Sequence, residues 1–161
     1  MFYTERLKLR NFKPDDIKTL FEYRNDPKCG TFQTWDDTTQ AYLEMLIETN
    51  SNRDLTNCEG HYAITINETD ELIGDFYISK KGQTISLGFT ISPLFQRKGF
   101  MYELLDAFIP HLLQNHSDCE ICCLVHPENR ASQHLMKKLN FSKEEFIEKW
   151  NSDVFVRTKS S

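Results

Sequence analysis

The sequence contains no apolar run near the roughly 20 residues that a membrane-spanning helix requires. Its first segment, Met1 to Arg6, also lacks the apolar core of a secretory signal peptide. These absences predict a cytoplasmic protein without a membrane partner. No linker rich in glycine, serine or proline and no internal repeat interrupts the 161 residues, so we expect one domain spanning residues 1–161.

An excess of basic residues is also missing. The formal net charge is −5, which argues against a nucleic-acid partner held by a diffuse basic face. Hydrophobic residues make up 39% and charged residues 27% of the chain, which is typical of a globular domain that folds in water. With 12 phenylalanines, the core or a binding pocket should be rich in aromatic rings.

The cysteines do not form a metal-binding pattern. There are 5, an odd number that we interpret as free thiols. Cys119, Cys122 and Cys123 lie close to His116 in the sequence, so a zinc site has to be considered. A structural zinc site needs four well-spaced ligands, whereas these cysteines lie on a segment with the pattern of a buried strand. The sequence therefore predicts no metal.

The hydrophobic pattern predicts a strand, two helices, three strands, a helix, a strand, a helix and two strands. The expected strands cover residues 6–11, 61–67, 72–79, 84–91, 119–125, 143–150 and 153–158. The expected helices follow Pro14, Asp37, Gly99 and Arg130; the first should bury Ile17, Leu20 and Phe21, and Pro110 should kink or interrupt the third. A strand–helix–strand crossover among hairpins predicts an α/β (α+β) fold with mixed strand pairing.

The main chemical signal lies between the strand that ends at Ile91 and the next helix. The run Gln96-Arg97-Lys98-Gly99-Phe100-Met101 places a glycine at the start of that helix. The first N–H groups of a helix lack partners and lie at the positive end of its dipole, so they can bind an anion. With two basic residues at the rim, a diphosphate fits best. The run is neither a Walker loop nor a dinucleotide fingerprint, and a plain polar loop is the alternative.

Two longer runs give this loop a context. Ile85 to Pro93 followed by Gln96 to Glu103, with His126 to Ser132 downstream, resembles the cofactor motif of the GCN5-related N-acetyltransferases (GNAT). Thr4 to Arg10 and Tyr23 to Pro27 are similar to the RimJ/RimL-like branch of ribosomal-protein N-terminal acetyltransferases. The resemblance implies the GNAT fold, a mixed, mostly antiparallel twisted sheet of about seven strands flanked by about four helices. It also implies transfer of an acetyl group from acetyl-CoA to a primary amine by direct attack in a ternary complex.

The resemblance implies site residues as well. The strand end formed by Phe89, Thr90 and Ile91 would separate from its neighbour and bind the pantetheine arm, with a backbone N–H polarising the thioester carbonyl. The pyrophosphate would lie on Gln96, Arg97, Lys98, Gly99, Phe100 and Met101. Asn129 would hydrogen-bond the cofactor arm. Tyr23, Phe32 and Trp35 would form an aromatic wall for the acceptor, although each ring could equally be part of the core.

The sequence departs from the family pattern at the proposed proton donor. Many members carry a tyrosine seven residues after the asparagine, where this chain has Met136, whose thioether cannot donate a proton. Ser132 could serve as the acid instead, or could simply cap the helix. Glu148 is the preferred candidate for the base and Asp75 and His61 are further ones, with a solvated carboxylate as the alternative for Glu148.

Two further departures concern glycine positions. Met101 stands where the loop usually ends in glycine or alanine, so its side chain could crowd the phosphate while its N–H remains available. Asn140 replaces the usual glycine before Phe141, which is a mild change because asparagine tolerates the left-handed conformation.

The sequence leaves the acceptor and the assembly open. The amine could be a protein N-terminus or a small amine such as a polyamine or an aminoglycoside-like sugar. The missing tyrosine also admits a protein that binds an acyl-CoA without transferring the acyl group. A monomer and a homodimer are both compatible with the sequence.

Overall fold

The computed structural model describes residues 1–33 and 37–160. The strands are β1 (Phe2–Tyr3), β2 (Leu7–Arg10), β3 (Glu59–Ile66), β4 (Leu72–Lys81), β5 (Thr84–Ile91), β6 (Glu120–Val125), β7 (Ser142–Ile147) and β8 (Ser152–Arg157). The helices are α1 (Ile17–Arg24), α2 (Pro27–Gly30), α3 (Gln40–Thr49), α4 (Phe100–Asn115) and α5 (Arg130–Lys138). Short 3-10 turns are η1 (Pro14–Asp16), η2 (Leu55–Asn57), η3 (Pro93–Phe95) and η4 (Glu148–Trp150).

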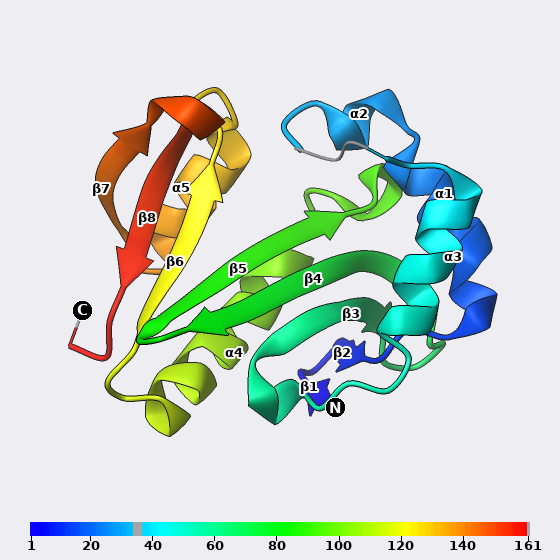
Figure 1. Cartoon of the computed structure of the whole chain (residues 1–161), viewed down its shortest axis with the longest axis horizontal. Coiled ribbons are helices and arrows are strands. Elements are labelled where there is room, and N and C mark those ends of the chain that lie inside the picture. The colour runs from blue at the N-terminus through cyan, green and yellow to red at the C-terminus, as the bar shows by residue number, and fades with distance from the viewer. Residues whose placement is uncertain (34–36, 161) are drawn as a thin grey trace.

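The strands form one sheet in the order β1-β2-β3-β4-β5-β6-β8-β7. Only β5 and β6 run parallel, and the other neighbours are antiparallel. Figure 1 shows α4 behind the sheet, and α1 and α3 at the side of β3 and β4. The expected mixed, mostly antiparallel architecture is confirmed. The sheet has one more strand and one more helix than expected, because the two-residue β1 pairs with β2 and the short α2 follows α1.

The crossover helix α4 supplies much of the main core. Leu104, Leu105, Phe108 and Ile109 on its inner face are at most 1% exposed, a stripe with the helical period. The α-helix continues through Pro110, so the expected interruption is wrong. Pro110 is exposed, and burial of the opposite face outweighs the single missing N–H. No helix within the described residues is long and apolar enough to cross a membrane.

A second core cluster lies between α1, α3 and the sheet. Leu20 and Tyr23 of α1 are buried there together with Leu43 of α3. Phe21, expected on the buried face, is 37% exposed. Its place is taken by Tyr23 and Arg24, and we attribute the rotation of the helix to the polar contacts that these two side chains make with β4, described below.

The cysteine-bearing strand is confirmed as β6. Cys119 and Cys123 are buried and Cys122 is half-buried, all as free thiols. Burial raises the pKa of each thiol, so at neutral pH they are protonated and pack as small apolar groups. Within residues 1–33 and 37–160 no group of three or more His, Cys, Asp and Glu side chains is placed to hold a metal ion.

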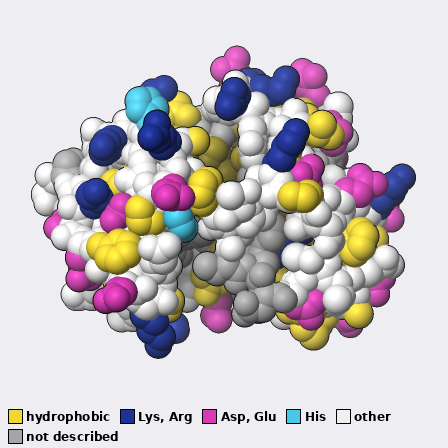
Figure 2. All heavy atoms as spheres, turned by 90° about the horizontal axis from the view of Figure 1, so that it is seen from above, with side chains coloured by type: hydrophobic (Ala, Val, Ile, Leu, Met, Phe, Trp, Pro, Cys, Tyr) yellow, Lys and Arg dark blue, Asp and Glu magenta, His cyan; other side chains and the backbone are white. Residues whose placement is uncertain are grey.

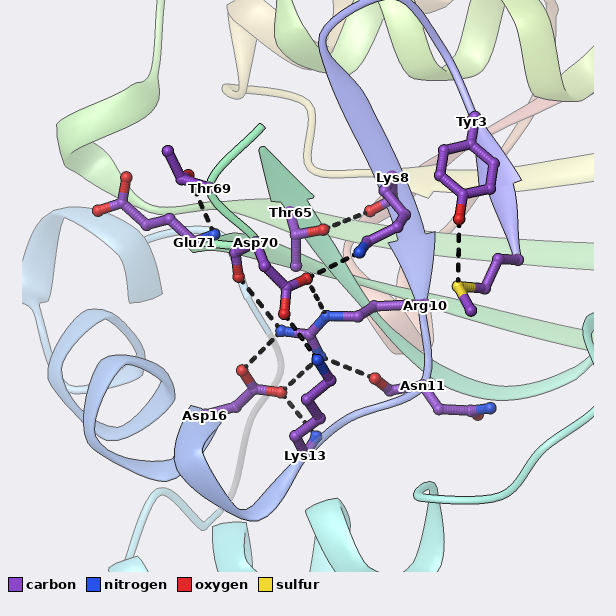
Figure 3. Close-up of polar contacts among 11 residues, drawn as sticks. Tyr3, Lys8, Arg10, Asn11, Lys13, Asp16, Thr65, Thr69, Asp70 and Glu71 are labelled. Atoms are coloured by element: carbon purple, nitrogen blue, oxygen red, sulfur yellow. Dashed lines mark hydrogen bonds and ion pairs between the residues drawn. The ribbon is translucent and has the colours of Figure 1, made fainter. Parts of the chain in front are cut away.

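Ion pairs join β2 to η1 and to the β3–β4 turn (Figure 3). Arg10 donates from both terminal nitrogens to Asp16 at 2.9 Å, and both residues are buried. Its Nε donates to Asp70 at 2.7 Å, and Lys8 and Lys13 pair with the same carboxylate. A buried carboxylate is tolerated only when such partners compensate its lost hydration. The cluster therefore fixes the start of α1 against the sheet.

Candidate active site

The parallel strands β5 and β6 separate at one end of the sheet. Their pairing begins at Thr84 and Glu120 and ends at Leu87 and Cys123. The last residues of β5, 88–91, remain paired to β4, and those of β6 remain paired to β8. Each arm of this fork therefore keeps its outer neighbour, while its inner backbone edge lacks a strand partner. The expected separation of the strand end at Phe89 to Ile91 is confirmed.

A close approach between β4 and β5 holds the outer side of the fork. Gly74 lies opposite Ile91, and a Cβ at Gly74 would lie only 2.2 Å from the backbone oxygen of Thr90. The Ser92 N–H also donates to the Ile73 carbonyl at 2.7 Å. A residue without a side chain is required here, because any Cβ would overlap the neighbouring backbone.

The fork contains a cavity of about 80 Å³. It is lined by Phe32, Gln33, Leu87, Gly88, Phe89, Leu124, Val125, His126, Asn129 and Ser132. Four residues that the sequence singled out, one from each of Phe32, Phe89, Asn129 and Ser132, therefore meet in one place. Figure 2 looks onto this end of the molecule, where the surface is hollowed between its two halves and hydrophobic side chains lie inside the hollow.

The start of α5 forms one wall of the cavity. Asn129 caps this helix, and its side-chain oxygen accepts a hydrogen bond from the Ser132 N–H at 3.2 Å. The capping group is thus Asn129, not Ser132, which removes the simplest structural explanation for the Ser132 side chain. Met136 is fully buried in the main core, so the position where many relatives place a tyrosine does not reach the cavity.

His126 also lines the cavity, although the sequence analysis assigned it no role. Its ring packs on Phe32 with centroids 5.0 Å apart. The Glu128 N–H donates to Nδ1 at 3.0 Å, and Nε2 lies 3.1 Å from the Asn151 side-chain amide. Both ring nitrogens are therefore occupied, and the ring is held as a fixed wall. Its position directly after a buried strand was the available sequence signal.

The glycine of the basic loop lies at the start of α4, as expected. Gly99 is the N-cap residue with φ of +77°, and Arg97 also has a positive φ of +64°. The Glu103 N–H donates to the Gly99 carbonyl at 3.0 Å, so the three N–H groups before it precede the regular helical ladder. Gln96 bridges the loop to β5 by donating to the Ile91 carbonyl at 3.1 Å.

The side chains at the end of this loop point into the protein. Phe100 is buried, and Met101 packs against the main core. The expected crowding by Met101 is therefore directed away from the helix terminus. The backbone of residues 99–101 and the exposed side chains of Gln96, Arg97 and Lys98 form the outer surface.

On the acceptor side, Tyr23 belongs to a buried polar cluster. Its hydroxyl donates to Asp75, and Arg24 pairs with the other carboxylate oxygen at 2.8 Å. Burial and the Asp75 charge raise the pKa of Tyr23 well above its usual value. Tyr23 is 3% exposed, so it lies behind the surface rather than on it, and Asp75 is engaged by two partners. Trp35 lies outside the described residues.

The other two candidate bases lie apart from the cavity lining. Glu148 is exposed and begins η4; the strand expected to continue to Trp150 ends at Ile147, where the chain turns sharply into β8. His61 is half-buried on β3, where burial lowers its pKa, and its ring packs on Tyr77 at 4.8 Å between centroids. η4 nevertheless adjoins the open end of the fork, because Asn151 contacts His126.

Comparison with known proteins identifies this architecture. A family model described as an acetyltransferase (GNAT) domain matches residues 6–142. An uncharacterized N-acetyltransferase, YnaD of Bacillus subtilis (strain 168), is 26% identical over 148 residues, covering 91% of this chain and 85% of YnaD. An acetyltransferase of the GNAT family from Bacillus anthracis has a TM-score of 0.84 at 18% identity and covers 99% of this chain and 98% of that one.

Two further solved structures have the same fold and differ in their described acceptors. A RimL ribosomal L7/L12 alpha-N-protein acetyltransferase in complex with coenzyme A has a TM-score of 0.76 at 18% identity, covering 96% of this chain and 95% of that one. The spermidine N-acetyltransferase SpeG from Vibrio cholerae has a TM-score of 0.69 at 20% identity, covering 94% and 91%. The acceptor therefore has to be inferred from this chain's own residues. With most of its length matched by the family model, this chain belongs to the GNAT acetyltransferases, as an acetyl-CoA-dependent N-acetyltransferase.

Proposed function

We propose that this N-acetyltransferase acetylates the N-terminal amine of a protein or peptide, which attacks the acetyl group directly in a ternary complex. The observation that carries the proposal is a pair of hollows that meet at Gln33. The cavity in the fork is one, and the other, of about 360 Å³, is lined by Arg24, Asn25, Asp26, Pro27, Gly30, Thr31, Gln33 and Thr38. Together they provide a place for a reacting amine and a continuation for the chain that follows it.

The chemistry of the two linings favours a peptide. The described lining of the fork cavity carries no carboxylate, whereas a polyamine or an aminoglycoside needs several anionic partners for its ammonium groups. In the second hollow, Asn25, Thr31, Gln33 and Thr38 offer neutral donors and acceptors that suit the amides of a peptide backbone. The RimL neighbour, described as an alpha-N-protein acetyltransferase, agrees with this choice.

The residues of the chain fit acetyl-CoA. The unpaired inner edge of β5 at Phe89 to Ile91 can bind the amides of the pantetheine arm as a neighbouring strand would. The start of α4 has the left-handed Gly99 and unpaired N–H groups that suit a diphosphate. When bound, acetyl-CoA supplies the acetyl thioester. A backbone N–H of β5 would hydrogen-bond the thioester oxygen, and Asn129 would hold the arm.

Two side chains are proposed to handle protons. The Ser132 hydroxyl, at the cavity wall, would donate to the departing sulfur. The proton of the acceptor ammonium would leave through water to Glu148, which is exposed at the open end of the fork. His126 would position the acceptor through its ring, because both of its nitrogens are occupied.

A panel of acceptors tests this function. Thiol release from acetyl-CoA would be measured with peptides that have free N-termini, with the same peptides blocked at the N-terminus, and with spermidine and an aminoglycoside. We expect turnover with the free peptides alone, and a mass gain of one acetyl group on the α-amine. Preferential turnover of spermidine or the aminoglycoside would contradict the peptide acceptor. Tight binding of acetyl-CoA without turnover on any acceptor would favour a protein that binds the acyl-CoA without transferring the acetyl group.

A further inference from the structure

The segment that precedes β2 lies against the start of α4. The Arg6 guanidinium donates from its two terminal nitrogens to the Lys98 carbonyl at 3.2 and 3.3 Å. Its Nε donates to Glu103 Oε1 at 2.6 Å, and its backbone N–H donates to Glu103 Oε2 at 2.9 Å. The Thr4 hydroxyl donates to the same Oε2. One side chain thus joins both ends of the turn that begins α4.

Arg6 also covers the middle of this turn. Its guanidinium carbon lies 4.4 Å from the centre of the Phe100 ring, a cation–π contact. A Cβ added at Gly99 would lie 3.7 Å from an Arg6 terminal nitrogen. Lys98, Gly99 and Phe100 are consecutive residues of the proposed diphosphate-binding turn, and Arg6 is near all of them. We name this set of contacts between Thr4, Arg6, Lys98, Phe100 and Glu103 the Arg6 clasp.

The charge of Glu103 makes the clasp necessary for anion binding. Glu103 lies in the first turn of α4, where a carboxylate is favourable for the helix alone but repels an anion bound at the same terminus. Burial would raise the pKa of Glu103, but the hydrogen bonds from Thr4 and Arg6 and the Arg6 charge lower it overall. The carboxylate is therefore ionised at neutral pH, and its charge is compensated by Arg6 on the side of the turn.

We propose that Arg6 is a positioning residue for the diphosphate of the acyl-CoA, because it holds the turn at residues 98–100 in place and neutralises Glu103. This inference rests on the proposed placement of the diphosphate at Gln96 to Met101. Arg6 contributes through the turn and through Glu103, so its removal affects the part of the donor that carries the diphosphate. The acetyl group and the acceptor lie in the fork, away from the clasp.

Calorimetric binding of coenzyme A to the full chain tests the clasp without requiring turnover. We expect Arg6→Ala to weaken coenzyme A binding about tenfold, the scale of one uncompensated charge near the surface. Arg6→Lys keeps a charge but loses the two-pronged contact with the Lys98 carbonyl, so it should fall between the two. Lys81→Ala, which removes an equal charge at the far end of β4, should bind as the wild type does.

Two comparisons separate this role from a general effect on folding. Acetyl-pantetheine lacks the diphosphate, so kcat/KM with this donor should be the same in Arg6→Ala and the wild type, while KM for acetyl-CoA rises. Adding Glu103→Gln to Arg6→Ala should regain about half of the lost affinity on a logarithmic scale, because the uncompensated charge is then gone. A general loss of structure would reduce both donors equally and would not be rescued.

Three results would overturn the proposal. The first is equal coenzyme A affinity in Arg6→Ala and the wild type. The second is an equal loss with acetyl-pantetheine, and the third is no rescue by Glu103→Gln. If Arg6→Ala does not fold, Arg6→Lys with and without Glu103→Gln answers the same questions. Failure of the wild type to bind coenzyme A would instead contradict the proposed function, so the two failures are distinguishable.

Discussion

Replacing Gly74 by alanine would test how tightly β4 holds the outer arm of the fork. The new Cβ would lie 2.2 Å from the Thr90 backbone oxygen and 3.1 Å from the Ile91 Cα. Contacts of this kind below 3.0 Å essentially do not occur, so the strands must move apart by about 0.8 Å. The opposing atoms belong to the backbone and cannot rotate away, as the end of a side chain could.

The expected cost follows from this rigidity. Overpacking a rigid site costs about 1–3 kcal/mol, and the gain from a stiffer unfolded chain offsets at most about 1 kcal/mol. We therefore expect Gly74→Ala to lower the free energy of unfolding by about 2 kcal/mol. For a domain of this size, that corresponds to a fall of roughly 4–8 °C in Tm. Because β5 carries the edge proposed to bind pantetheine, KM for acetyl-CoA should also rise.

Urea unfolding followed by circular dichroism would measure the change. Gly88→Ala is the matched control on the adjacent strand, since its Cβ would meet Tyr77 Cβ at an ordinary 3.7 Å. The control should stay within about 1 kcal/mol of the wild type. A Gly74→Ala protein as stable as Gly88→Ala would refute the argument, because it would mean that β4 and β5 adjust without cost.

Other substitutions address the chemistry and the pH dependence. Ser132→Ala should lower kcat about 100-fold, the usual contribution of an acid, with coenzyme A affinity unchanged; an unaltered kcat at saturation would exclude Ser132 as the acid. Gly99→Val should weaken coenzyme A binding at least about tenfold, because a β-branched residue is strained at φ of +77°; equal affinity would contradict the placement of the diphosphate. Burial raises the pKa of Asp70, but hydrogen bonds from Lys13, Arg10 and Lys8 lower it well below its usual value. A carboxyl with a depressed pKa stabilises the fold above its ordinary pKa of about 4, and this contribution is lost as the pH falls further. Asp70→Asn should therefore flatten the loss of stability between neutral pH and pH of about 3, as followed by thermal melts; an unchanged acid profile would show that Asp70 is not its source.

Local patterns were sufficient where one element decides its own structure. The apolar stripe of α4 predicted a helix with the correct buried face. Gly99 marked the start of that helix, because few other residues accept a positive φ at low cost. Alternating residues likewise predicted β3, β4 and β5 to within a few residues.

The same local reasoning failed where a distant partner decides. The stripe Ile17, Leu20 and Phe21 is a correct helical pattern, yet α1 turns Tyr23 and Arg24 inward to Asp75, which lies on β4. A hydrophobic pattern contains no information about a charged partner about 50 positions away in the chain. For the same reason, the sequence analysis assigned His126 no role, because its importance arises from Phe32 and Asn151 packed around it.

The sequence by itself determined the family, the order of the elements and the loop proposed to bind the diphosphate. These depend on contiguous motifs and on periodicity, which a chain carries whether or not it is folded. The tertiary structure decided where β5 and β6 separate, which side chains line the resulting cavity, and that Arg6 reaches Glu103 across the fold. Such contacts depend on strand register and on packing between distant segments, and the physical interactions that select them exist only after the sheet has formed.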